Sequence, residues 1–520
     1  MYRGGLVADA KEYARRLVRG SSTIFTALIV AGVLGLVLRM FLTRSLSLSD
    51  YGMFYLVFTW ISFLALFRDM GLNSALTKFI PEFLSNKRFD RVKSLILFVT
   101  SLQVLVALPV SLSLFFFSDQ IAVAIAGTTG ASLIVKALGI WFFIMTFFHV
   151  FRSSFQGFQD QAPYAAMEVL YICFTFFMVV VCVHMLRLGA TGAALGYLIA
   201  SPVLVAVWLG LMCRRHGAVL KGGLQINGAF VKKVLEFSLM VFVGSIGGVI
   251  LSYMDTIMIG AFHTTADVGL YQAAQPITLL ISYFSAALGI VLMPMTSEIW
   301  ARKENELLSR AVHLILKFSM MIIVPIVFVL MTFPDVVLRS VFGPEYVLAT
   351  ITLQILTAAV VLSTLFSILQ SVAAGIGKPV LTTITILAMA CLNLIGNFLL
   401  IPPYGIVGAA VTTFISWFFG LILILCLLRN SIKFAVPGRS ILKTIIAGAV
   451  AMLVITVLKS VVILEPWWAK APVVILPSLV VYVGVILVTK SVSKEELNVL
   501  SYAVPIPKRL LMFMEKILRD

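Results

Sequence analysis

The sequence carries little charge. Only 12% of its 520 residues are Asp, Glu, Lys or Arg, whereas 61% are hydrophobic and the mean hydropathy is +1.09. Soluble domains contain roughly 25% charged residues, so this composition excludes a soluble protein with a single membrane anchor. It predicts an all-α polytopic membrane protein, in which most of the chain lies in the bilayer.

Cysteine and histidine are also scarce, with five residues of each. The cysteines lie in or beside apolar stretches without metal-site spacing, and we interpret them as small hydrophobic residues rather than disulfide partners. The chain lacks a phosphate-binding loop ending in Lys-Ser or Lys-Thr, a His-Glu-x-x-His motif and a Gly-x-Ser-x-Gly motif. We therefore expect no enzymatic activity and no cofactor, apart from a sodium ion considered below.

Basic residues exceed acidic ones, which gives a formal net charge of +17. A nucleic-acid partner would require these residues to form one patch, but they are dispersed over the loops between apolar stretches. A cytoplasmic location of those loops, near anionic lipid headgroups, explains them better. We expect membrane lipids, and no nucleic acid, among the partners.

Fourteen apolar stretches are long enough to cross a membrane, for which an α-helix needs about 20 residues. The predicted spans are 22–43, 52–75, 94–117, 132–151, 164–185, 190–213, 236–259, 273–296, 311–333, 349–373, 380–401, 406–428, 441–459 and 472–489. At both ends of the chain, 5–19 and 495–520 mix basic and apolar residues at helical spacing. These segments are compatible with helices on the membrane surface or with ordinary tails that dock on the bundle.

The distribution of basic residues predicts the orientation. With the N-terminus inside, thirty Lys and Arg fall on cytoplasmic segments and five on the opposite side. This asymmetry follows the positive-inside rule and predicts a multi-pass protein of the cell membrane with both termini in the cytoplasm. Four basic residues lie inside predicted spans, namely Arg39, Arg68, Lys136 and Lys317.

The two halves of the chain repeat each other at an offset of 216 to 218 residues. The matching segments are Gly189-Ala-Thr-Gly192-Ala-Ala with Gly405-Ile-Val-Gly408-Ala-Ala, Gly157 with Gly375, Pro109 with Pro325, and Asp50-Tyr-Gly52 with Asp267-Val-Gly269. Each half holds six spans, an even number, so both halves begin on the same side. This pattern predicts two six-helix lobes related by a parallel pseudo-two-fold repeat, with a substrate path at their interface.

The repeat also predicts the domain organisation. The expected segments are a cytoplasmic N-terminal segment 1–21, an N-lobe 22–213, a cytoplasmic linker 214–235, a C-lobe 236–429, two additional spans within 430–490 and a cytoplasmic tail 491–520. The last two spans lie outside the symmetry.

Charged side chains in the first half are candidates for substrate binding. A charge at mid-bilayer costs about 2.5–3.5 kcal/mol on insertion scales, so it needs a partner or a water-filled cavity. We expect Arg39 to line a cavity, whereas pairing and substrate contact are equally compatible with Arg68 and Asp69. Lys136 can reach the interface by snorkelling, and Glu168 can neutralise a nearby cation. A cationic cavity suits an anionic substrate such as a lipid phosphate or pyrophosphate.

The second half has a different polar constellation. Asp255 occupies the position equivalent to Arg39, and Asn393 and Asn397 share one face of a helix because they are four residues apart. Thr413 lies in the following span. One carboxylate with neutral oxygens is a donor set for a hard monovalent cation such as sodium. The alternative is that Asn and Thr hold neighbouring helices together.

Several segments resemble a known family. These are Leu48–Tyr55, Phe67–Ile80, Asp255–Gly260 and Asp267–Tyr271, which are similar to segments of polysaccharide-biosynthesis flippases in the multidrug/oligosaccharidyl-lipid/polysaccharide exporter superfamily. The resemblance implies two six-helix lobes in a V shape, alternating access and two additional C-terminal helices. It also implies a sodium site at Asp255, Asn393, Asn397 and Thr413, by similarity to the lipid II flippases. The chain departs from that branch at Asn397, where the branch has a second acid.

Together these observations predict a flippase for a lipid-linked oligosaccharide on a polyprenyl phosphate or pyrophosphate. It would act from the cytoplasmic to the outer leaflet by alternating access, coupled to an ion or to the membrane potential. A cation-coupled multidrug exporter is the alternative within the superfamily, although it would favour acids over Arg39 and Arg68. A non-transporting scaffold of a glycan-assembly complex is a third hypothesis, against which the buried charges argue. Other glycan-assembly proteins are candidate partners.

Overall fold

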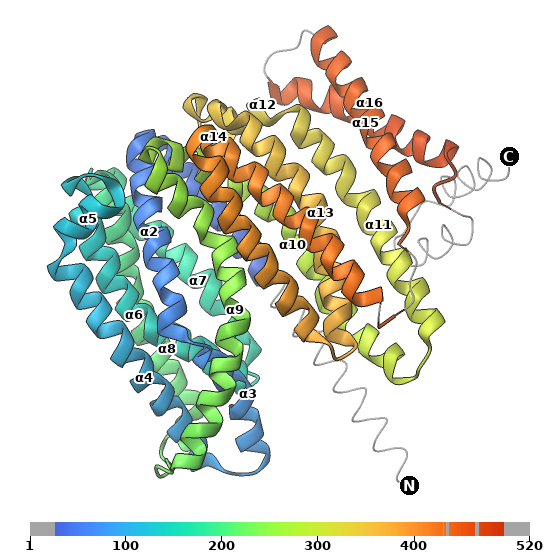
Figure 1. Cartoon of the computed structure of the whole chain (residues 1–520). Coiled ribbons are helices and arrows are strands. Elements are labelled where there is room, and N and C mark those ends of the chain that lie inside the picture. Colours follow the sequence, from blue (N-terminus) through green and yellow to red (C-terminus); the bar gives the residue numbers. More distant parts are fainter. Residues whose placement is uncertain (1–25, 430, 433–435, 463–466, 493–520) are drawn as a thin grey trace. The chain divides into compact units, whose positions relative to one another are not determined.

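A computed structural model describes residues 26–429, 431–432, 436–462 and 467–492, which are almost entirely helical and contain no strand (Figure 1). The helices are Thr26–Ser45, α2 (Leu48–Asp69), α3 (Leu72–Ser85), α4 (Phe89–Phe116), α5 (Ser118–Ala126), α6 (Ser132–Gly157), α7 (Gln161–Val180), α8 (Gly189–Leu220), α9 (Gly228–Phe262), α10 (Thr265–Ala301), α11 (Asn305–Thr332), α12 (Pro334–Val341), α13 (Thr350–Gly375), α14 (Pro379–Arg429), α15 (Gly438–Val461) and α16 (Trp467–Val488). Short helical turns occur at Thr129–Ala131, Val181–Met185 and Pro344–Ala349.

The predicted spans correspond to these helices. Twelve helices in the described part of the chain are long and apolar enough to cross a membrane. One of them, α14, contains two predicted spans that meet at Gly405, whose backbone is non-helical at φ 56° and ψ −134°. The predicted span 273–296 lies within α10. An all-α polytopic membrane protein is therefore confirmed, whereas the predicted surface segments 5–19 and 495–520 lie outside the described residues.

One predicted span is interrupted. The stretch 52–75 is predicted as a single span, but α2 ends at Asp69 and α3 begins at Leu72. Met70 and Gly71 between them adopt left-handed backbone conformations, with φ of 43° and 75°. A helix cannot continue through two such residues. The predicted boundary at 75 is therefore wrong, because the first helix of this stretch ends at Asp69 and residues 72–75 belong to α3.

Equivalent residues of the repeat have equivalent local structure. A Cβ on Gly157 would lie 2.8 Å from the carbonyl oxygen of Leu76, and a Cβ on Gly375 would lie 2.8 Å from that of Met293. Each glycine thus allows a close helix–helix contact that a larger residue would block. Gly157 and Gly375, which the sequence repeat matches, therefore make the same kind of contact, each within its own half of the chain.

The structure groups the chain into two compact units. The first contains the described residues up to Leu280, together with Val341–Ala349 and Thr383–Ser416. Aromatic side chains form much of its core, and the ring centroids of Phe58, Trp141 and Tyr197 are 5.3 to 6.2 Å apart. The predicted division into lobes at 213 and 236 stays a prediction.

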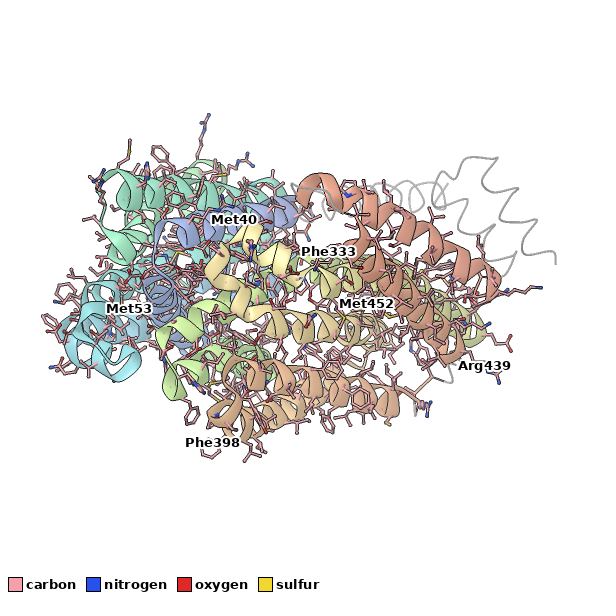
Figure 2. All side chains as sticks on the ribbon, turned by 90° about the horizontal axis from the view of Figure 1, so that it is seen from above. Met40, Met53, Phe333, Phe398, Arg439 and Met452 are labelled. Atoms are coloured by element: carbon pink, nitrogen blue, oxygen red, sulfur yellow. The ribbon has the colours of Figure 1, made fainter. Side chains whose placement is uncertain are left out.

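The second unit contains Ile281–Ser340, Thr350–Thr382 and the described residues from Trp417 onward. In this unit α15 packs along both α11 and α16. Figure 1 shows α15 and α16 next to each other. Phe333, Ile455 and Val474 form a buried cluster, and Figure 2 marks Phe333. Gly448 contributes to this packing because the ring of Phe328 occupies the position of a Cβ.

Large apolar side chains cover the outer surfaces of the helices. Leu105 is 68% exposed, Phe116 71% and Val480 72%, and Figure 2 shows Phe398 on the outside of α14 in the same way. Exposed apolar area costs about 25 cal/mol per Å² in water. Contact with lipid tails removes this cost and accounts for these surfaces.

Candidate functional site

Asp255 lies at the centre of a buried polar cluster in the first unit. It projects from α9 and is only 3% exposed. The hydroxyls of Tyr271 and Thr413 each donate a hydrogen bond of 2.6 Å to its Oδ2. The amides of Asn393 and Asn397 donate to its Oδ1 at 3.2 and 2.7 Å. Three of the four residues predicted for a cation site therefore converge on the carboxylate of the fourth, Asp255.

The chemistry of this cluster fits a monovalent cation. A carboxylate has about four acceptor positions, and these four donors fill them. Asn397 Oδ1 is a buried acceptor with no hydrogen-bond donor in the described part of the chain. Rotation of the two amides about their terminal bonds would turn both amide oxygens toward Asp255. The set then consists of one carboxylate, two amide oxygens and two hydroxyls, which are the neutral and anionic oxygens that sodium prefers.

Arg39 lies nearby in the same unit and is held by neutral groups. Its NH1 donates to the main-chain oxygen of Gln272 at 2.9 Å and to Gln272 Oε1 at 3.0 Å. Its guanidinium lies 4.3 Å from the centre of the Tyr55 ring, a cation–π contact. Among ion pairs between described residues, none involves Arg39. Its charge is thus solvated by dipoles and a ring rather than neutralised by an acid.

Arg68 and Asp69 have different neighbours. Arg68 is 3% exposed, donates to the carbonyl oxygen of Phe142 at 2.7 Å and leaves its Nε without a partner. Asp69 Oδ1 accepts from the backbone N–H of Asn73 at 3.1 Å, so its carboxylate caps the first turn of α3. Gln103 Nε2 lies 3.5 Å from the same oxygen. Asp69 therefore has a local structural role.

Lys136 and Glu168 lie apart from the Asp255 cluster. The Lys136 ammonium is half-buried and 6.0 Å from the centre of the Phe115 ring. Glu168 forms an ion pair with Arg152 at 3.3 Å, so it neutralises a cation at the end of α6 rather than Arg39. Of the five residues predicted to bind substrate, the structure brings Arg39 next to the cluster, whereas the other four contact neighbours outside it.

Tyr271 and Gln272 were not among the predicted site residues, although both are in direct contact with them. Tyr271 is part of the segment Asp267–Tyr271 that matches Asp50–Tyr55 in the repeat. That repetition is the one sequence signal that could have indicated it. Gln272 is a polar residue in an apolar span, which is a signal of the same kind as Asn393 and Asn397.

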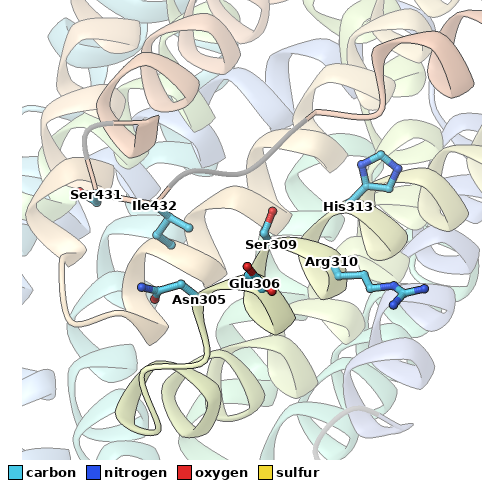
Figure 3. Close-up of a pocket in the computed structure, with 7 residues that line it drawn as sticks. All are labelled: Asn305, Glu306, Ser309, Arg310, His313, Ser431 and Ile432. Atoms are coloured by element: carbon cyan, nitrogen blue, oxygen red, sulfur yellow. The ribbon is translucent and has the colours of Figure 1, made fainter.

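A separate cavity of about 770 Å³ lies in the second unit (Figure 3). Its lining residues come from the start of α11 and from the segment that follows α14, and they are Asn305, Glu306, Ser309, Arg310, His313, Ser431 and Ile432. None of the predicted site residues lines it. The lining contains the acid Glu306 and the basic residues Arg310 and His313, so its charge does not indicate which kind of ligand the cavity would bind.

Two family models match the chain. Residues 17–300 match the model described as polysaccharide biosynthesis protein, and residues 241–399 match the MatE model. The uncharacterized membrane protein MJ1068 of Methanocaldococcus jannaschii is 29% identical over 425 residues, which cover 78% of this chain and 84% of that protein. A protein of Haloferax volcanii, described as the probable low-salt glycan biosynthesis flippase Agl15, is 26% identical over 404 residues, or 77% of this chain and 81% of its own length.

The fold is similar to that of a solved flippase. The lipid II flippase MurJ in an inward closed conformation matches 89% of this chain and 97% of its own, with a TM-score of 0.72 and 15% sequence identity. The likeness concerns the fold, because the identity is low. With more than half of its length matched by the first of these family models, the chain belongs to the polysaccharide biosynthesis protein family.

Proposed function

We propose that the protein translocates a lipid-linked oligosaccharide from the cytoplasmic to the outer leaflet of the cell membrane by alternating access. The observation that carries this proposal is Arg39, whose guanidinium is solvated by Gln272 and Tyr55 without a carboxylate. A half-buried cation of this kind can bind a phosphate or pyrophosphate, and Arg does so through two parallel hydrogen bonds. The similar proteins Agl15 and MurJ, described as a probable glycan biosynthesis flippase and a lipid II flippase, support the same substrate class.

The chain's residues have distinct tasks in this scheme. Arg39 holds the phosphate of the headgroup, while the polyprenyl tail stays among the lipids outside the apolar helix surfaces. Asp255, Asn393, Asn397 and Thr413 hold the coupling cation, and Tyr271 orients the carboxylate by its hydrogen bond. A bound sodium ion supplies one positive charge that neutralises Asp255 in a site from which water is largely excluded. Coupling through a proton would need Asp255 alone, whereas sodium uses the neutral oxygens as well.

A second candidate function is cation-coupled export of small drugs. It is favoured by the MatE model match over residues 241–399, which contains Asp255, Asn393 and Asn397. The unneutralised charge of Arg39 disfavours cationic drugs, because a like charge in a low-dielectric cavity is repulsive.

Deletion of the gene in its native host tests the proposal. Lipid-linked sugars are detected in each leaflet separately, and sensitivity to cationic dyes is measured in the same cells. The proposal predicts accumulation on the cytoplasmic face. The wild-type gene and Arg214→Ala, a control at an exposed position, should reverse it, whereas Arg39→Ala should not. Undiminished outward transfer would show that the protein is not the flippase, and dye sensitivity alone would identify a drug exporter.

A further inference from the structure

The Asp255 cluster and Arg39 are joined by a continuous series of contacts. Tyr271 donates to Asp255 Oδ2 at 2.6 Å, and the next residue, Gln272, donates from Nε2 to Thr256 Oγ1 at 2.7 Å. Thr256 in turn follows Asp255. Two consecutive residues of α10 thus bind two consecutive residues of α9, and Gln272 also accepts from Arg39 at 3.0 Å. All five residues belong to the first unit.

Arg39 determines which way the Gln272 amide points. A guanidinium has only donors, so the amide must present its oxygen to Arg39 and its NH₂ group to Thr256. The opposite orientation would place two donors against each other at Arg39. Gln272 is 4% exposed and Thr256 is 1% exposed, so water cannot readily replace Thr256 or Arg39 as a hydrogen-bond partner of the Gln272 amide. A movement of α10 against α9 therefore changes the Thr256 and Arg39 contacts together.

The same junction links positions that correspond at an offset of 217 residues, one more than the offset that pairs Arg39 with Asp255. Arg39 and Tyr55 are 16 residues apart, as are Thr256 and Gln272, and the two pairs are 217 residues apart. Arg39 contacts Tyr55 through the ring face, and Gln272 contacts Thr256 through a hydrogen bond. The hydrogen bond from Arg39 to Gln272 therefore connects the pair Arg39 and Tyr55 directly to the pair Thr256 and Gln272.

Close backbone contact between α2 and α10 lies in the same region of the fold. A Cβ on Gly52 would overlap the carbonyl oxygen of Thr265 and lie 2.8 Å from the backbone nitrogen of Gly269. The hydroxyls of Ser49 and Thr265 are 2.7 Å apart. Tyr51, between Ser49 and Gly52 on the first turn of α2, donates to the main-chain oxygen of Gln272 at 3.3 Å. The contact of these two helix starts is thus tied to Gln272.

We propose that Gln272 is a positioning residue that transmits the state of the Asp255 site to Arg39 and to the contact between the starts of α2 and α10. The inference rests on the proposed cation coupling. A cation held by the carboxylate and the Tyr271 hydroxyl oxygen turns the Tyr271 proton away from Asp255. The direct 2.6 Å hydrogen bond between α10 and α9 is then replaced by a longer bridge through the cation, and Gln272, the next residue on α10, is displaced relative to Thr256. Arg39 is then released to bind a phosphate, and the α2–α10 contact loosens.

Disulfide cross-linking at the α2–α10 contact tests this relay without any substrate. Ser49 and Thr265 are replaced by cysteine in a chain whose five native cysteines are replaced by alanine. The cross-linking rate of the purified protein is measured in sodium chloride and in choline chloride at equal ionic strength. Sodium is expected to lower the rate at least about fivefold, the lower end of typical coupling between two sites.

Two variants on α10 distinguish the relay from general effects of mutation. Gln272→Met keeps the length of the side chain and the main-chain contact with Arg39, and it is expected to cross-link at a rate that no longer depends on sodium. Gln275→Met, a matched change one turn away on α10, is expected to retain the full sodium effect. If Gln272→Met fails to fold, Gln272→Glu keeps an acceptor for Arg39, lacks the donor for Thr256 and is expected to lose the sodium effect as well.

The outcomes separate the relay from the proposed function. Sodium dependence that persists in the folded Gln272 variants overturns the relay. Thermal stabilisation by sodium with no effect on cross-linking also overturns it, while the cation site stands. Absence of any sodium effect on thermal stability or cross-linking overturns both the relay and the proposed coupling by sodium.

Discussion

The hydrogen bond from Thr413 to Asp255 permits a quantitative test of the buried cluster. Thr413→Val replaces the hydroxyl by a methyl group of similar volume and removes a donor 2.6 Å from Oδ2. Hydrogen bonds to charged groups contribute about 1.5–3 kcal/mol. Tyr271 remains as the second donor to the same oxygen, so we expect the free energy of unfolding to fall by about 2 kcal/mol rather than by the cost of a bare buried charge.

The preceding residue provides a matched control. Thr412 is 2% exposed, but its hydroxyl donates to the carbonyl oxygen of Gly408 in its own helix at 2.9 Å. Thr412→Val removes a bond between neutral groups, for which we expect a loss of about 1 kcal/mol or less. Both substitutions keep a branched side chain in α14 and differ mainly in the group that loses its partner.

The measurement is equilibrium unfolding of the purified variants in detergent, at low sodium. A double-mutant cycle with Asp255→Asn then isolates the part that depends on charge, since the Thr413→Val loss should fall to about 1 kcal/mol once the carboxylate is an amide. Equal losses at Thr412 and Thr413, or an unchanged Thr413 loss in the Asp255→Asn background, would refute the assignment of Thr413 to the carboxylate.

Three further predictions concern the cation, the helix contact and the orientation. Sodium should raise the melting temperature of the purified protein above its value in choline, and Asp255→Asn should remove the difference; equal melting temperatures in both salts would argue against a sodium site. Gly52→Ala should lower the free energy of unfolding by about 1–3 kcal/mol, because its methyl group meets the backbone of Thr265. In the same unfolding assay Gly35→Ala, which has open space around it, should be neutral or stabilising. A cysteine at position 125 should react with an impermeant thiol reagent from outside intact cells and one at position 225 only after permeabilisation; the reverse pattern would invert the predicted topology.

Much of the fold could be predicted from hydropathy and from the repeat. Long apolar runs identify helices because lipid imposes both their composition and their length. The end of α2 was missed because the backbone turns at Met70 and Gly71, while the predicted span continues past the charged pair Arg68 and Asp69. Hydropathy measures what a residue contacts and does not indicate where a helix axis changes direction.

The candidate site was predicted unevenly for a similar physical reason. Asp255, Asn393, Asn397 and Thr413 could be grouped because a lone acid in an apolar span needs polar neighbours, and the family resemblance supplied their pairing. Their convergence on one carboxylate is a feature of the structure. The partner of Glu168 could not be predicted, since Arg152 lies on another helix and the pair forms only through packing.

Gln272 shows what sequence alone leaves open. An isolated Gln in an apolar span indicates that some partner exists, but its two ends can serve many groups. Only the packing of α9, α10 and the helix Thr26–Ser45 shows that these ends join Thr256 and Arg39.

Translocation by the purified protein in lipid vesicles tests the central claim most directly. Vesicles carry a fluorescent sugar on a short polyprenyl pyrophosphate, and a membrane-impermeant reagent reports the fraction in the outer leaflet. We predict that wild-type protein accelerates exchange between leaflets, that Arg39→Ala abolishes this activity while the protein remains folded, and that Arg39→Lys retains part of it because the charge stays and the bidentate geometry is lost. Exchange by Arg39→Ala at the wild-type rate would contradict the account, because the unneutralised guanidinium would then have no part in moving the phosphate.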